Sequence, residues 1–312
     1  MRTLFIASTC ALVAAIALVW SASGPAGGQT WSPARTPWGD PDLQGIWTNQ
    51  TSTPLERPNE LGGRAALSEE EAEEREEAAR LSSDNAPRAG DPGTYNAFWR
   101  DPGQALTRTS LIIDPPDGRV PPLTPEATLR LEARAADRRA RGPADSWEDF
   151  STWTRCITRG LIKIGSFYSS NHQILQAPGY VVILQELIHE ARIIPLDGRP
   201  PLPHTVRQWM GDSRGRWEGN TLVIDTTNFT DKNPFRGSGE TLHLVERLTR
   251  ADADTIDYQF TVDDPKTFTR QWTVSMPMTR GSGLFEYACH EGNYAMTNML
   301  AGARAEEQTR LR

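Results

Sequence analysis

Hydrophobic and polar residues alternate along much of the second half of the chain, with the two-residue period typical of strands that bury one face. The clearest example is residues 255–262, where every second side chain is apolar or aromatic. Residues 180–184 are apolar throughout, as in a strand buried on both faces. Turn sequences such as residues 218–220 separate about eight such stretches, the last of which covers residues 284–288. The pattern predicts a mainly β protein, an antiparallel meander that closes into a lipocalin-like barrel, with a β-sandwich as the alternative.

The first third of the chain is rich in proline and glycine, and two helices are expected within it. Ser68 precedes a run of glutamates and caps a helix near residues 69–81, because acidic side chains suit the first turn of a helix. Thr124 and Pro125 open a second helix near residues 125–141, since proline favours the first helical position. This part has too few periodic apolar residues for a core of its own, so we expect it to wrap the sheet.

The chain begins with the layout of a cleaved secretory signal peptide. Arg2 is followed by an uncharged apolar run over residues 4–20, which ends in small residues and is short of the roughly 20 apolar residues of a spanning helix. We therefore expect a signal peptide at 1–26, a Pro/Gly-rich wrapping region at 27–150 and an antiparallel β domain at 151–307. The mature protein is expected in the periplasm or outside the cell, without a stable membrane span.

Cleavage of that signal leaves two cysteines, Cys156 and Cys289. In an oxidising compartment an isolated pair of cysteines favours a disulfide over a free nucleophilic thiol. A loop of this length stabilises the folded state by about 4–5 kcal/mol in the chain-entropy description.

The charge balance and the missing motifs exclude several classes of protein. The chain carries a formal net charge of −7, which disfavours nucleic acid as a partner because such proteins present a basic face. It contains no G-x-G-x-x-G or phosphate-binding loop, so no nucleotide cofactor is expected. The G-x-S-x-G sequence of serine hydrolases is also missing.

Histidine is scarce, with five in the chain, and three are expected on or beside strands with a carboxylate near in sequence. Acid–base catalysis needs such a group in a cleft, whereas a divalent metal needs several donors that converge. Each histidine taken alone also fits an ordinary hydrogen-bonded structural role. Residues 185–189 lack the first histidine of a zinc-protease motif, and they follow a β run, so that class is rejected. The candidate catalytic residues are His189, His290, Glu186, Glu291 and His243.

Arginines and aromatic residues form a second group of candidates. They can line a mouth that accepts anions or aromatic rings, through bidentate hydrogen bonds and stacking. Ordinary surface positions on strands are the alternative for several of them, such as Arg216 and Trp217. The candidate substrate-binding residues are Arg192, Asn171, Trp209 and Tyr294.

Two segments, GDSRGRWEGNTLVI at residues 211–224 and YACHEGNY at residues 287–294, resemble a family of secreted bacterial proteins. With RCITR and YVVIL the resemblance covers roughly residues 40–307. It implies a secreted, β-rich protein and points to no activity, cofactor or catalytic residue. Members can carry histidine where this chain has Gln185, which disfavours any role that needs a base at that position.

Two functions fit these observations, with a structural envelope protein as a third and weaker one. The first is an enzyme of acid–base chemistry (hydrolysis, elimination or isomerisation) on a small, partly apolar molecule, with His189 or His290 as the base and Arg192 on a substrate carboxylate or oxyanion. The second is a lipocalin-like binding protein without catalysis, since barrel mouths serve both uses. Histidines that cluster favour the enzyme; scattered histidines with their own partners favour the binder.

Overall fold

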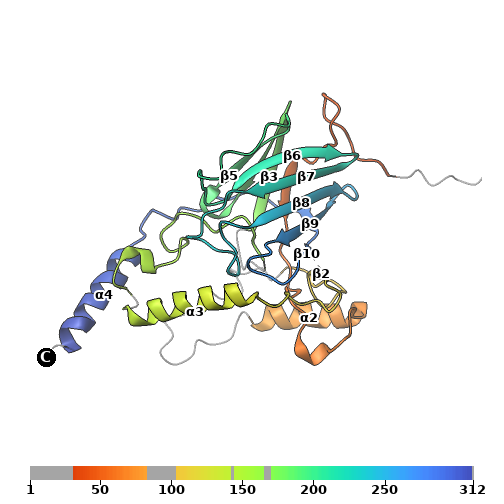
Figure 1. Cartoon of the computed structure of the whole chain (residues 1–312). Helices are drawn as coiled ribbons and strands as arrows, with labels where there is room; N and C mark the ends of the chain where they lie inside the picture. The colour runs from red at the N-terminus through yellow and green to blue at the C-terminus, as the bar shows by residue number, and fades with distance from the viewer. Residues whose placement is uncertain (1–30, 83–102, 142–143, 165–169, 311–312) are drawn as a thin grey trace, which may run out of the picture. The chain divides into compact units, whose positions relative to one another are not determined.

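The computed structural model describes residues 31–82, 103–141, 144–164 and 170–310 of the chain (Figure 1). Residues Pro33–Arg312 form one unit by their internal contacts. The expected signal peptide at 1–26 lies outside the described residues. Among the described helices, none combines the length and the hydropathy needed to cross a membrane.

The fold is mainly antiparallel β, as predicted, with a barrel-like sheet that is nearly closed. Nine of its eleven strands follow the order β5-β4-β3-β1-β11-β9-β8-β7-β6, while β10 lies between β2 and β9. Figure 1 shows β6, β7, β8, β9 and β10 as successive neighbours. The strands are β1 (Gly45–Thr48), β2 (Ile112–Asp114), β3 (Asn171–Ala177), β4 (Tyr180–Gln185), β5 (Ala191–Pro195), β6 (Asp212–Glu218), β7 (Thr221–Thr227), β8 (His243–Arg250), β9 (Thr255–Asp263), β10 (Trp272–Ser275) and β11 (Met278–Arg280).

Alternation in the sequence sets the two faces of the strands. In β9 the apolar residues are buried and the polar ones between them are partly exposed, so each inward position follows the two-residue period. The hairpin between β6 and β7 turns at Gly219, whose φ of 62° lies in the left-handed region that glycine adopts without strain. Aromatic side chains fill the core, where the rings of Phe268 and Trp272 meet edge to face at 5.7 Å.

The two edge strands of the sheet, β5 and β6, approach each other without pairing. A Cβ atom added at Gly215 of β6 would lie 2.6 Å from Leu196 Cδ2 and 2.9 Å from Ile194 Cγ2. Only glycine allows the backbone this close to β5, so residue 215 sets how tightly the two edge strands pack.

The N-terminal third supplies a strand to the middle of the sheet. Strand β1 pairs with β3 on one side and with β11 on the other. Its Trp47 is fully buried and donates a hydrogen bond from Nε1 to the Leu43 carbonyl at 2.9 Å. The guanidinium carbons of Arg280 and Arg250 lie 4.3 and 4.8 Å from its ring, in cation–π contacts that hold the strand to its neighbours.

Both expected helices are present, as α2 (Glu69–Ser82) and α3 (Pro125–Ala140). Ser68 and Glu71 bond to each other's backbone N–H groups at 3.2 and 2.8 Å, which forms a capping box at the start of α2. The Thr124 side chain accepts from the Ala127 N–H and caps α3. Three short 3₁₀ turns, η1 (Asn59–Leu61), η3 (Trp147–Asp149) and η4 (Leu187–His189), and a third helix, α4 (Ala295–Arg310), complete the described elements.

The last expected strand, at residues 284–288, is wrong. This segment has no regular structure, and the final strand is β11 instead. The Phe285 N–H donates to the buried carboxylate of Glu186 at 3.1 Å. The backbone N–H of Phe285 therefore bonds to the Glu186 side chain and not to the backbone of a neighbouring strand. The chain then continues into α4.

Candidate functional site

A small cavity of about 30 Å³ lies inside the barrel, with room for about one water molecule. Apolar side chains, Met276 and Met278 among them, line part of its wall. The polar side chains of the wall are all more than nine-tenths buried. We call them the interior polar cluster: Asn49, Lys163, His172, Gln185, Arg192, Glu246 and Tyr258.

An ion pair crosses the interior of the barrel. Both terminal nitrogens of Arg192, on β5, donate to the carboxylate of Glu246, on β8, one of them at 3.1 Å. The Tyr258 hydroxyl, on β9, donates to the same carboxylate at 2.9 Å. Burial, and then the Glu246 charge, raise the pKa of Tyr258 well above its ordinary value, so this hydroxyl keeps its proton and stays a donor.

Four other polar atoms at this cavity have no hydrogen-bond partner among the described residues. They are Lys163 Nζ, His172 Nε2, Gln185 Oε1 and Arg192 Nε. They come from the segment before β3, from β3, from β4 and from β5, so separate parts of the chain bring them to one place. A buried polar group without a partner costs about 1–3 kcal/mol, so these four groups destabilise the fold unless something else bonds to them.

Burial also changes the ionisation of two of these groups. Loss of solvation, and then the nearby Arg159 charge, lower the pKa of Lys163 from 10.5 to about 8. Loss of solvation, and then the charges of Lys163 and Arg192, lower the pKa of His172 to about 3. At neutral pH the site therefore holds a charged lysine and a neutral imidazole side by side.

The three predicted catalytic histidines lie on different segments of the chain, and none of them lines the interior cavity. His189, at the end of η4, and His290, between β11 and α4, are exposed. His243, on β8, is half-buried, and its Nε2 lies 2.9 Å from Asp225 Oδ1. Within residues 31–82, 103–141, 144–164 and 170–310, no three His, Cys, Asp or Glu side chains are placed to hold a metal ion.

Glu186 is buried but faces Asn171 instead of a histidine. Its carboxylate accepts from the Asn171 side-chain amide at 2.8 Å and from the Asn171 N–H at 3.2 Å. The third donor is the Phe285 N–H. Glu186 thus anchors the C-terminal segment to the start of β3, with one carboxylate oxygen on Asn171 and the other on Phe285.

The remaining predicted residues lie apart from the interior cavity, except Arg192. Glu291 and Tyr294 are exposed. Trp209 lines a separate pocket of about 80 Å³ beside Phe229. Arg192 alone of the predicted side chains belongs to the interior polar cluster.

Sequence reasoning missed most of the cluster, although one signal was available. His172, Glu246 and Tyr258 stand at inward positions of their strands, where apolar side chains occupy the neighbouring inward positions. A polar residue on the apolar face of a strand is the feature that could have found them. Lys163 lies in a segment without regular structure, and no pattern of the sequence marks it.

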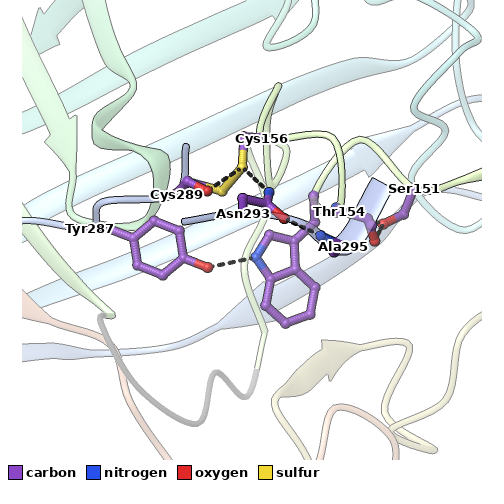
Figure 2. The surroundings of a disulfide bond; sticks show 8 residues. Ser151, Thr154, Cys156, Tyr287, Cys289, Asn293 and Ala295 are labelled. Carbon is purple, nitrogen blue, oxygen red and sulfur yellow. Dashed lines mark hydrogen bonds between the residues drawn. A yellow bond between two sulfur atoms is a disulfide. The ribbon is translucent and has the colours of Figure 1, made fainter. Parts of the chain in front are cut away.

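The expected disulfide joins Cys156 to Cys289. It ties the segment that carries Lys163 to the segment that follows β11. Figure 2 shows the bond between Cys156 and Cys289. Beside it the Trp153 Nε1 donates to the Tyr287 hydroxyl at 3.0 Å. A covalent bond and a hydrogen bond therefore hold the Lys163 segment against the barrel.

Comparison with known proteins adds no relative to this description. No protein-family model, curated protein or solved structure matches the chain.

Proposed function

We propose that the protein binds a small, partly apolar molecule inside the barrel, at the interior polar cluster. One observation carries the proposal: four buried polar atoms without partners among the described residues line the same cavity. Apolar side chains would fill the space at a lower cost in folding free energy, so a ligand is a physical reason to keep the polar ones. Apolar walls with a few convergent polar groups are typical of small-molecule sites.

The histidines favour a binding protein over an acid–base enzyme. His189 and His290 are exposed, and His243 is bonded to Asp225, so none of the three lines the interior cavity. Their predicted catalytic roles stay predictions. The disulfide is typical of an oxidising compartment, which supports a site of action in the periplasm or outside the cell.

Acid–base catalysis is the second candidate because of Lys163. Burial holds the pKa of this amine at about 8, near the pH at which a general base works best. In this alternative Lys163 takes a proton from the substrate while Arg192 holds a carboxylate or oxyanion. The reactions remain hydrolysis, elimination or isomerisation.

Methionine methyl groups offer a test that needs no knowledge of the ligand. Met276 and Met278 line the cavity, whereas Met296 and Met299 lie on α4. We would label the methionine methyls with carbon-13 and add a library of small neutral, cationic and anionic compounds in turn. Binding in the barrel shifts the signals of Met276 and Met278 and leaves those of α4 in place.

The same spectra separate the outcomes. A compound that shifts the two cavity methyls and stays unchanged in solution supports the binding protein, and one that is converted supports the enzyme. If no compound of any class shifts the cavity methyls, or if every shift falls on α4, the proposed function is wrong.

A further inference from the structure

Two of the four unpartnered atoms of the interior polar cluster are obligate hydrogen-bond donors. Lys163 Nζ and Arg192 Nε carry only donor hydrogens, and Gln185 Oε1 is the single obligate acceptor among the four. The charges in the cavity wall are those of Lys163, Arg192 and Glu246, so positive charge is in excess below pH 8. Glu246 already accepts from Arg192 and Tyr258. The site therefore lacks an acceptor with negative charge.

Two further carboxylates lie near Lys163 and do not fill this need. Glu186 and Glu190 both act on the lysine through their charges, but neither lines the cavity. Glu186 accepts from Asn171 and Phe285, and Glu190 accepts from the Thr158 hydroxyl. Their oxygens are thus engaged away from the cavity.

A second, outer pocket of about 260 Å³ shares Lys163 with the interior cavity. The basic side chains of its wall are Arg159, Lys163 and Arg236, and its other described side chains are Ile162, Ile164 and Phe235, so no carboxylate of the described residues lines it. Among the described residues, the nearest carboxylate to Arg236 is that of Glu56, whose Oε2 lies 3.8 Å from Arg236 Nη1 outside the pocket wall. Because Lys163 lines both spaces, reorientation of its flexible side chain can join them.

We propose that the ligand is a small carboxylate with a short apolar body, which enters through the outer pocket and places its carboxylate between Lys163 and Arg192. This inference rests on the proposed function and names its ligand class. The carboxylate supplies the acceptors that the two unpartnered donors lack, and the apolar body takes the place of water beside Met276 and Met278. The basic outer pocket attracts an anion toward the site.

Propionate and propionamide form a matched pair of probes, alike in shape and different in charge. We would titrate each into methyl-labelled protein and follow Met276 and Met278. Propionate is expected to bind at least about tenfold more tightly, since hydrogen bonds to a charged group are worth more than neutral ones. In Lys163→Met the preference should fall to within about threefold, whereas Lys232→Met, at an exposed lysine, should keep it.

The comparison of propionate with propionamide decides whether the ligand is a carboxylate. Equal or tighter binding of propionamide, or an unchanged preference in Lys163→Met, overturns the carboxylate assignment. The proposed function survives that result as long as other compounds shift the cavity methyls. If no compound shifts them, the proposed function itself has failed, so the two failures are distinguishable.

The entry route has its own test at Arg236. Lys163 is needed for both pockets, but Arg236 lines only the outer one. Arg236→Gln should weaken propionate binding about threefold at low salt and have no effect at high salt, because salt screens exposed charges. Arg247→Gln, at an exposed arginine of β8, is the matched control. Equal effects of the two substitutions would contradict this route.

Discussion

Replacing Lys163 with methionine measures how much unfolding free energy the protein loses by burying a charged amine inside the barrel. Methionine has a similar length, no charge and enough flexibility to fill the same space. Burial, and then Arg159, lower the pKa of Lys163 from 10.5 to about 8. One pH unit corresponds to about 1.4 kcal/mol. At pH 7 the charged amine therefore destabilises the native state by on the order of 3 kcal/mol, and Lys163→Met should raise the free energy of unfolding by that amount.

The pH dependence identifies the cause of that gain. Between pH 8 and 10.5 the folded protein has lost the Lys163 proton while the unfolded chain still binds one, so wild-type stability rises with pH across this window. The penalty is complete below pH 8 and vanishes above 10.5. We therefore expect the advantage of Lys163→Met to shrink to about 1.4 kcal/mol at pH 9.5.

Urea unfolding followed by tryptophan fluorescence gives these free energies for the wild type, for Lys163→Met and for Lys232→Met as a control. The wild type and Lys163→Met share every other titrating group, so their difference isolates the buried amine. A Lys163→Met protein that is less stable than the wild type at pH 7 would refute the reasoning. A gain that is the same at pH 7 and 9.5 would show that lost charge is not its source.

Four other variants test the structure around the site. Changing Cys156 and Cys289 to serine should lower the free energy of unfolding by about 4–5 kcal/mol, and an unchanged urea midpoint would contradict the stabilising role of the bond. Glu246→Gln leaves the Arg192 charge buried without its carboxylate, so the same assay should register a loss of about 3–5 kcal/mol. The double variant R192M/E246L removes both charges, so it should lose less unfolding free energy than Glu246→Gln. A larger loss in the double variant would contradict the idea that an unpaired buried charge causes the destabilisation. Gly215→Ala adds a Cβ that meets side chains of residues 194 and 196 at 2.6–2.9 Å. It should lower the free energy of unfolding by about 1–3 kcal/mol and speed amide hydrogen exchange in β5 and β6. Unchanged exchange in these strands would show that their spacing adapts to the added methyl group.

The sequence predicts local features of this fold well because their causes are local. The alternation in residues 255–262 fixes the faces of β9, and Ser68 with Glu71 fixes the start of α2. The disulfide follows from there being only two cysteines after position 26. By contrast, nothing near residue 285 reveals that its N–H bonds to Glu186, because that partner lies ninety-nine positions away.

The interior polar cluster depends on contacts that only the folded, nearly closed sheet creates. Arg192 on β5 is predicted as a binding residue, but its partner Glu246 lies fifty-four positions further along the chain. Glu246 is on β8, the third strand counted from the opposite edge of the sheet. The period of β8 predicts an inward residue 246 and says nothing of what it faces across the barrel. Lys163 belongs to no periodic element, so its burial follows from the tertiary structure alone.

The bond between Cys156 and Cys289 closes a covalent ring around the chain from β3 to β11. A protease that cuts one hairpin within this ring, such as the turn at residues 251–254 between β8 and β9, leaves two pieces that are still joined. The nicked protein would keep the mobility of an intact chain on a gel without reductant and separate only after reduction. Strand β1 lies outside the ring, so a cut between residues 49 and 155 removes the covalent link between the strand at the middle of the sheet and the rest of the barrel.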